Sequence, residues 1–231
     1  MMNDGPVFGV NQGDDNRLGV LDRLIAGLKV PVLNVLEIGS YEGRSALAFS
    51  ASIGRHCKHG GSVTCVDPWI PYLPTDDISS NETCQRMEDD LRNGAVFDRF
   101  ITNIKHTHKH VPIYFHVGTL SSFVLSASAA GARFGMVYID GSHIYEDVSA
   151  DINNAKALVE TGGIICGDDL ERQLNTCDPE LVRQIRHREY VDNFHPGVTL
   201  AVWEAFGKVW SDNGVWAMQK CDRGGEKWSF P

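Results

Sequence analysis

From residue 16 to about residue 190, short apolar runs alternate with segments in which apolar residues recur at helical spacing. Short apolar runs, typical of strands buried in a parallel sheet, occupy 32–38, 62–66, 113–117, 134–139 and 163–166. Segments with helical spacing separate them, at 16–28, at 43–53 and most clearly at 144–159, where Ile144, Val148 and Ile152 share one face. Such alternation predicts parallel βαβ units, and hence an α/β fold with a doubly wound sheet.

Three regions depart from this alternation. Residues 69–110 are long for a link between strands; we predict a loop followed by helices over 82–93 and 95–103, and expect this insertion to line an acceptor site. Residues 1–15 are polar and rich in Gly and Asp, which predicts a mobile N-terminal arm. After a short helix through Phe206, segments 208–211 and 214–220 predict a closing hairpin. The whole chain, 1–231, is expected to form a single domain.

Composition narrows the choice of partners. The formal net charge of −9 argues against a long nucleic-acid surface, which needs clustered Lys and Arg. No apolar run approaches the roughly 20 residues that cross a bilayer, so no membrane partner is expected. The six cysteines lie far apart without a Cys-x-x-Cys pair, which favours free thiols in a reducing cytoplasm. A homo-oligomer is left open.

The first strand ends in a glycine turn that opens a helix. Gly39 and Gly43 allow a sharp turn and a close approach to a ligand, and the N–H groups of the helix start suit a carboxylate. The spacing lacks the middle glycine of the dinucleotide fingerprint. Asp67 ends the next strand, where an acidic residue can accept hydrogen bonds from both ribose hydroxyls. S-adenosylmethionine has a ribose and a carboxylate but no pyrophosphate. Alternatively, the turn is structural and Asp67 is solvated.

Four motifs in chain order resemble one enzyme family. They are Glu37-Ile-Gly-Ser-Tyr-Glu-Gly43, Val-Asp67-Pro-Trp, Tyr138-Ile-Asp140-Gly-Ser-His143-Ile-Tyr-Glu146-Asp-Val and Gly162-Gly-Ile-Ile-Cys-Gly-Asp168-Asp169. Together they are similar to class I methyltransferases of the group that contains macrocin-type sugar O-methyltransferases and cephalosporin hydroxylase-like proteins. The resemblance covers roughly residues 33 to 206. It implies a Rossmann-like methyltransferase sheet of seven strands, with a C-terminal antiparallel hairpin.

The expected cofactor site surrounds the glycine turn and the ends of the neighbouring strands. Its predicted residues are Glu37, Gly39, Ser40, Tyr41, Gly43, Ser45, Asp67, Trp69, Gly118, Thr119, Asp140 and His143. Gly118 and Thr119 follow the third strand and are expected to border the adenine, although Thr119 can also cap the next helix. Trp69 can close over the cofactor or simply pack within its loop.

Three carboxylates end the fourth and fifth predicted strands, which should be neighbours. Asp140, Asp168 and Asp169 are expected to converge at one sheet edge, where clustered like charges need a compensating cation, and hard oxygen ligands suit Mg²⁺. The resemblance implies the same metal site and a base three residues after Asp140. That place is held by His143, where the catechol-type enzymes have Lys. Alternatively, these residues cap turns or contact the cofactor.

The sequence therefore predicts an S-adenosylmethionine-dependent O-methyltransferase. We expect it to act on a hydroxyl of a small molecule or carbohydrate with a divalent metal, with His143 and Asp140 as catalytic residues. Two rivals remain: an oxidoreductase or hydroxylase on the same fold, and a non-catalytic cofactor-binding protein. His106, His108 and His110 alternate along the chain and are predicted to be solvated, with metal capture as the alternative.

Overall fold

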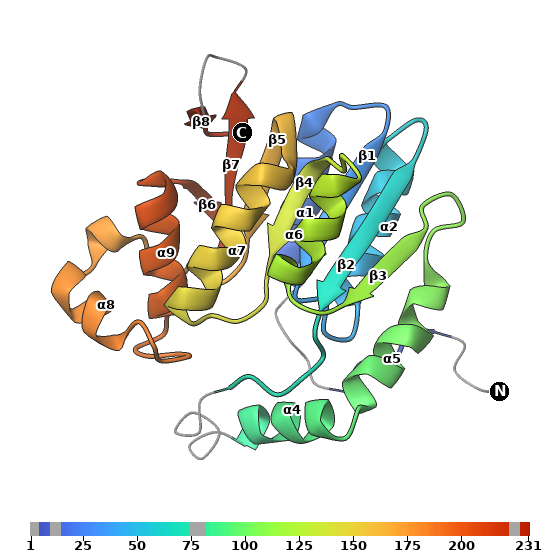
Figure 1. Cartoon of the computed structure of the whole chain (residues 1–231). Coiled ribbons are helices and arrows are strands. Elements are labelled where there is room, and N and C mark those ends of the chain that lie inside the picture. Colours follow the sequence, from blue (N-terminus) through green and yellow to red (C-terminus); the bar gives the residue numbers. More distant parts are fainter. Residues whose placement is uncertain (1–4, 10–14, 74–81, 222–226) are drawn as a thin grey trace.

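The computed structural model describes residues 5–9, 15–73, 82–221 and 227–231. Within these ranges, eight strands form one sheet in the order β3-β2-β1-β4-β5-β7-β6, with β8 paired to β7 (Figure 1). The strands are β1 (Leu33–Ile38), β2 (Gly61–Asp67), β3 (Ile113–Val117), β4 (Phe134–Ile139), β5 (Val159–Gly167), β6 (Trp210–Asp212), β7 (Val215–Cys221) and β8 (Lys227–Ser229). Strands β1 to β5 are parallel, whereas β7 runs antiparallel to both β5 and β6. The predicted doubly wound sheet with an antiparallel C-terminal hairpin is confirmed.

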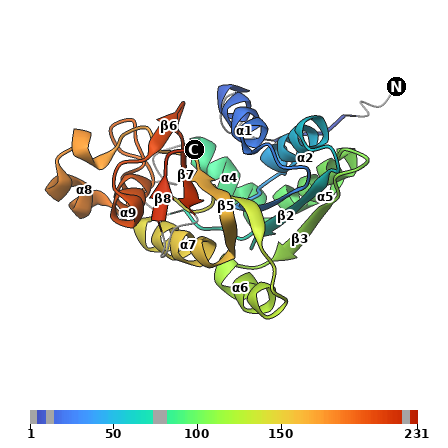
Figure 2. The ribbon, with the colours of Figure 1, turned by 90° about the horizontal axis from the view of Figure 1, so that it is seen from above.

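Helices cover both faces of this sheet (Figure 2). They are α1 (Asp15–Leu28), α2 (Arg44–His56), α4 (Glu82–Arg92), α5 (Ala95–Asn103), α6 (Leu120–Ala129), α7 (Tyr145–Leu158), α8 (Pro179–Ile185) and α9 (Pro196–Phe206). One buried cluster joins α1 and α2 to the sheet, and a second joins α6, α7 and α9 to it. In β1, Val35 belongs to the first cluster and Leu36 to the second, so burial on both sides explains the continuous apolar run.

The carboxyl ends of β1 and β4 approach each other closely. Gly39 follows β1 with a φ of +80°, and a Cβ at this position would collide with the backbone carbonyl of Asp140. Asp140 N–H in turn donates to the carbonyl of Ile38 at 2.8 Å. Only glycine satisfies both the left-handed conformation and the contact, so this residue joins the two strand ends that carry the site.

Several predicted elements have different bounds in the structure. The predicted helix 144–159 ends at Leu158, and β5 starts at Val159, because Val159 pairs with Phe134 before the register shifts. The helices predicted at 82–93 and 95–103 are present as α4 and α5, but β8 is an eighth strand that the sequence did not indicate. Among the described helices, none combines the length and apolarity that a membrane span requires.

Part of the predicted mobile N-terminal arm is attached to the body of the protein. Val7 N–H donates to Asn103 Oδ1 at 2.7 Å, and Asn103 Nδ2 donates to the Val7 carbonyl at 2.8 Å. Gly9 N–H donates to Glu42 Oε2 at 2.7 Å. Residues 5–9 are therefore hydrogen-bonded, contrary to a free arm, while residues 1–4 and 10–14 of that expectation lie outside the described residues.

Candidate functional site

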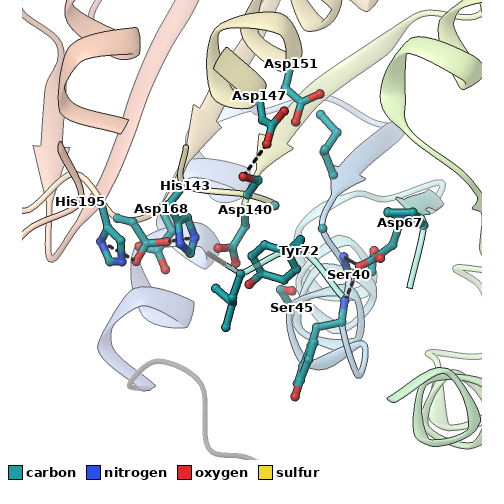
Figure 3. A pocket seen from close by; sticks show the side chains of 18 of the residues that line it. Ser40, Ser45, Asp67, Tyr72, Asp140, His143, Asp147, Asp151, Asp168 and His195 are labelled. Atoms are coloured by element: carbon teal, nitrogen blue, oxygen red, sulfur yellow. Dashed lines mark hydrogen bonds and ion pairs between the residues drawn. The ribbon is translucent and has the colours of Figure 1, made fainter. Parts of the chain in front are cut away.

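A cavity of about 830 Å³ opens at the carboxyl edge of the parallel strands. This size is within the range of small-molecule sites. Most of the predicted site residues line it: Gly39, Ser40, Tyr41, Ser45, Asp67, Gly118, Thr119, Asp140, His143, Asp168 and Asp169. Figure 3 shows Ser40 and Asp67 at one side of this cavity, His143, Asp168 and His195 at the other, and Asp140 between them. One space thus joins both halves of the predicted site.

Asp67 organises the glycine turn through the backbone. Its Oδ2 accepts the N–H groups of Ser40 and Tyr41, each at 2.9 Å, and its Oδ1 accepts the N–H of Trp69 at 2.6 Å. Tyr41 and Trp69 adopt left-handed conformations, with φ of 45° and 49°, and such strained residues often occur at functional sites. Burial raises the pKa of Asp67, and the three backbone hydrogen bonds oppose that rise.

Three predicted cofactor residues lie behind the cavity wall instead of lining it within the described chain. Glu37 is fully buried, where its Oε2 accepts from Ser40 Oγ at 2.6 Å and from Cys65 Sγ at 3.3 Å. Burial raises the pKa of Glu37 to about 7. Gly43 precedes α2, and a Cβ there would lie 3.1 Å from the Phe100 ring. Glu37 therefore stabilises the turn from the core side, and Gly43 leaves room for the Phe100 ring.

Trp69 is the third of these residues, and it has a packing role. The residue is 7% exposed, and its ring lies against Phe97 and Phe100, with ring centroids 4.9 and 4.6 Å away. Its Nε1 donates to the Tyr41 carbonyl at 2.8 Å. The ring therefore supports the turn and does not line the cavity, in contrast to the expected cofactor contact.

Residues that follow β3 and residues of α7 line the same cavity. Gly118 and Thr119 line the cavity here, and Thr119 Oγ1 also caps α6 by accepting Ser122 N–H at 3.3 Å, so the two alternatives for Thr119 are compatible. Asp151 of α7 also lines the cavity and was not a predicted site residue. Burial and the nearby Asp147 raise the pKa of Asp151 to about 7.

The insertion supplies the apolar side of the cavity. Its lining residues are Ile70, Tyr72, Leu73, Cys84, Met87 and Leu91. The buried carboxylate of Glu88 holds the loop, because its Oε1 accepts the N–H groups of Tyr72 and Leu73 at 2.9 and 2.8 Å. Figure 1 shows α4 beyond the carboxyl ends of β2 and β3. Residues 74–81 of the predicted insertion lie outside the described residues.

At the other end, Asp140 and Asp168 face a cation from the N-terminal helix. Arg17 of α1 forms an ion pair with Asp168, and its Nη1 lies 3.8 Å from Asp140 Oδ2. The buried Tyr138 also donates its hydroxyl to Asp140 Oδ2 at 3.0 Å. Burial raises the pKa of both carboxyls, that of Asp168 to about 7, with Asp169 adding to the rise and Arg17 opposing it.

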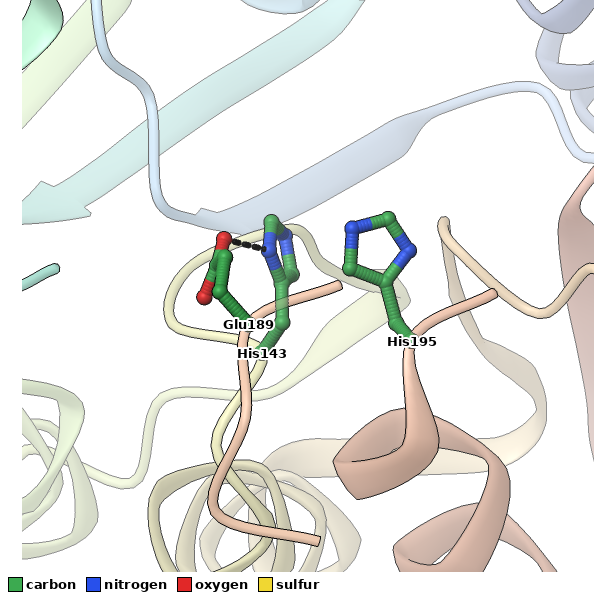
Figure 4. A group of neighbouring side chains, drawn as sticks. All are labelled: His143, Glu189 and His195. Carbon is green, nitrogen blue, oxygen red and sulfur yellow. Dashed lines mark hydrogen bonds and ion pairs between the residues drawn. The ribbon is translucent and has the colours of Figure 1, made fainter. Parts of the chain in front are cut away.

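His143 lies between the carboxylates of Glu189 and Asp169. Figure 4 shows His143 with Glu189 on one side and the His195 ring on the other. His143 Nδ1 is 2.5 Å from Glu189 Oε1, and its Nε2 is 2.9 Å from Asp169 Oδ2. Burial disfavours the charged ring, but Glu189 and Asp169 outweigh burial and raise the pKa of His143 well above its usual value. Burial would raise the pKa of Asp169, yet His143 holds it below its usual value. In this conformation both ring nitrogens of His143 face carboxylates, an arrangement that favours the protonated ring.

A second histidine extends this group. The His195 ring lies 4.5 Å from the His143 ring, centroid to centroid, and its Nδ1 is 2.9 Å from Glu171 Oε1. Arg17, Glu189 and His195 were not predicted as site residues. Glu189 precedes α9 and Arg17 lies in the first turn of α1, each far in sequence from the four motifs. The only signal for Arg17 and His195 was the expected need of three carboxylates for positive charge, and nothing in the sequence analysis pointed to Glu189.

The predicted metal ligands are not gathered around one point. Asp168 is paired with Arg17, and Asp169 with His143. Within the described residues, three groups bring ligand atoms within 4.8 Å of one another: His143, Glu189 and His195; Asp140, His143 and Asp169; and Asp169, Glu171 and His195. None contains Asp168, and each contains a histidine already paired with a carboxylate. The set Asp140, Asp168 and Asp169 therefore does not fit one ion in this arrangement, because Arg17 already neutralises Asp168.

Comparison with known proteins agrees with this fold. A family model described as a methyltransferase domain matches residues 36–170. No curated protein sequence matches the chain. Among solved structures, CalS11, a calicheamicin methyltransferase, is 14% identical with a TM-score of 0.53, over 88% of this chain and 78% of that protein. An O-methyltransferase from Bacillus cereus, solved in complex with SAH, is 15% identical with a TM-score of 0.48, over 85% of this chain and 70% of that protein. The chain belongs to the methyltransferase domain family and is a class I methyltransferase.

Proposed function

We propose that the protein transfers a methyl group from S-adenosylmethionine to a hydroxyl of a small molecule or carbohydrate. The observation that carries this proposal is the single cavity that connects the glycine turn and Asp67 with the acidic residues and His143. A methyl donor at one end of such a space meets a proton acceptor at the other, which is the proximity that methyl transfer requires.

The cofactor fits the turn end of the cavity. Gly39 lines this end of the cavity, and the N-terminus of α2, which begins at Arg44 after Gly43, suits the methionine carboxylate. Asp67 would bind the ribose, although three backbone N–H groups already use most of its acceptor positions. Gly118 and Thr119 would border the adenine, with Asp151 as an acceptor for its amino group.

The acceptor would lie between the insertion and the acidic end of the cavity. Its oxygen bonds to the methyl carbon as the carbon–sulfur bond breaks, the electron pair goes to sulfur, and the hydroxyl proton passes to His143 Nε2. Glu189 holds Nδ1 at 2.5 Å and so fixes the ring for this role. To act as a base, His143 must first lose a proton and part from Asp169. No step passes through a divalent ion, because the predicted ligand set does not fit one; Mg²⁺ stays a prediction from the clustered carboxylates and the family resemblance.

Binding and turnover test separate parts of this proposal. Thermal unfolding with S-adenosylmethionine, S-adenosylhomocysteine and nicotinamide cofactors separates the first rival, since a ligand at about 100 times its Kd stabilises by about 2.7 kcal/mol. Stabilisation by nicotinamide cofactors alone would overturn the proposal in favour of an oxidoreductase. Transfer of a labelled methyl group to a panel of hydroxylated acceptors, with product mass measured, then tests catalysis. Cofactor binding without transfer to any acceptor would favour the non-catalytic rival.

A further inference from the structure

Arg17 lies where the sequence predicts a metal ion. Its side chain is 13% exposed, and the side chains of the carboxylates that it faces, Asp140 and Asp168, are 14% and 5% exposed. Two buried carboxylates at one sheet edge need a positive charge nearby. Arginine remains protonated at any physiological pH and offers five N–H donors to such groups. The guanidinium therefore meets the requirement from which the metal was predicted.

The helix that carries Arg17 is held firmly in place. Asp15 Oδ1 pairs with Arg44 Nη2 of α2 at 2.6 Å, two residues before Arg17. One turn further along, Asp22 Oδ1 accepts from Ser52 Oγ at 2.5 Å and from Arg55 Nη2 at 2.7 Å. Leu21 and Ile25 are buried in the core on the same helix. Arg17 thus belongs to a packed element, so its position is set by the fold.

A guanidinium and a divalent ion compete for the same carboxylate oxygens. A Mg²⁺ ion binds oxygen at about 2.0–2.1 Å in octahedral geometry, which leaves no room for a cationic side chain on the same oxygen lone pairs. Placing both cations beside Asp140 and Asp168 would also add repulsion between like charges in a poorly solvated site. Binding of one cation must therefore displace the other.

We propose that Arg17 is the built-in cation of this acidic centre, in place of a divalent ion. The chain then transfers methyl groups without added metal, and a divalent ion occupies the centre only when the guanidinium is removed. The statement about turnover rests on the proposed methyl transfer, whereas the statement about ion binding does not.

Mn²⁺ binding, followed by electron paramagnetic resonance without cofactor or acceptor, tests the exclusion directly. The variant is Arg17→Met, which keeps an unbranched apolar stem and removes the charge. Arg23→Met is the matched control: Arg23 lies on the same helix and pairs with Asp212 Oδ2 at 2.6 Å, but its side chain is 62% exposed. Both variants thus lose one charge, only one of them in the cavity.

We expect Arg17→Met to bind Mn²⁺ at least about tenfold more tightly than the wild type, because two buried carboxylates lose their counter-charge. Arg23→Met should bind as weakly as the wild type, and adding Asp168→Asn to Arg17→Met should abolish the gain. Equal affinity of the wild type and Arg17→Met would overturn the proposal.

The unmodified protein provides a second test, which does not depend on the folding of a variant. A chelator should leave its methyl transfer unchanged. Tight Mn²⁺ binding by the wild type together with chelator-sensitive turnover would overturn the proposal. Absence of any methyl transfer would instead refute the proposed function and leave the Mn²⁺ comparison intact.

Discussion

At the β1–β2 end of the cavity, backbone groups make the main contacts, whereas side chains from distant segments meet at the β4–β5 end. Asp67 receives three N–H groups from residues that lie within one turn and one strand end. At the other end, by contrast, Asp168 pairs with Arg17 of α1, and His143 pairs with Asp169 after β5 and with Glu189 before α9. The β1–β2 end, held by backbone hydrogen bonds, is suited to binding the cofactor. The β4–β5 end, an ionic network around His143, is suited to proton transfer. Substitutions should therefore separate binding from turnover.

The largest effect is expected from His143→Ala. Loss of a positioned proton acceptor typically lowers the rate about 10²- to 10⁴-fold, so kcat should fall by that factor. The dissociation constant of S-adenosylmethionine should change little, because the glycine turn and Asp67 at the β1–β2 end are unchanged. Steady-state kinetics with calorimetric cofactor binding measure both quantities. If kcat is unchanged, His143 is not the base.

Asp67→Asn should give the opposite pattern. Hydrogen bonds to a charged acceptor contribute about 1.5–3 kcal/mol each, so we expect cofactor affinity to fall about tenfold to a hundredfold. The kcat at saturating cofactor should stay close to that of the wild type. A variant with normal affinity and reduced kcat would contradict the division of the cavity into a binding end and a proton-transfer end.

The dependence of activity on pH tests the pairing of His143 with Glu189 and Asp169. Because Glu189 and Asp169 raise the pKa of His143, its neutral form appears only as pH rises through that raised value, and activity should increase over the same interval. Glu189→Gln removes one of the two anions and should move the rising limb to lower pH by about one unit. An unmoved limb would mean that Glu189 does not act through His143.

The same pair links stability to pH. A pKa raised in the folded state means that the paired imidazolium stabilises the fold fully below the unfolded histidine pKa of about 6.5, and this contribution is lost as pH rises through the folded value. The free energy of unfolding, measured with urea, should therefore fall as pH rises across this interval, and it should fall less in Glu189→Gln. An equal decline in both proteins would contradict the pairing.

The smallest effect is expected at Thr119. Thr119→Ala removes the N-cap of α6 and should cost about 0.5–1 kcal/mol of stability, at the low end for caps because the bond is 3.3 Å long. Thr119→Ser should retain it. Urea unfolding measures the difference, and a loss of several kcal/mol would show that Thr119 does more than cap a helix.

Much of the fold and one half of the site were predictable from local pattern. Buried runs such as 134–139 match β4 residue for residue, because a central strand covered on both faces must be apolar throughout. Gly39 and Asp67 were recognisable because turn geometry and strand ends depend on neighbouring residues. The packing of Trp69 was not predictable in this way, because its environment is set by Phe97 and Phe100, which lie about 30 residues away.

By itself, the sequence determined the α/β class, the parallel strands, the glycine turn and the gathering of acidic residues at one sheet edge. These follow from periodicity and from the rule that parallel strands end at the same edge. Only the tertiary structure decided which charges pair there, because Arg17 reaches Asp168 through the packing of α1, and Glu189 and His195 reach His143 from the chain before α9. Charge pairing depends on distance in space, and contacts between segments more than 40 residues apart leave no periodic signal in the chain.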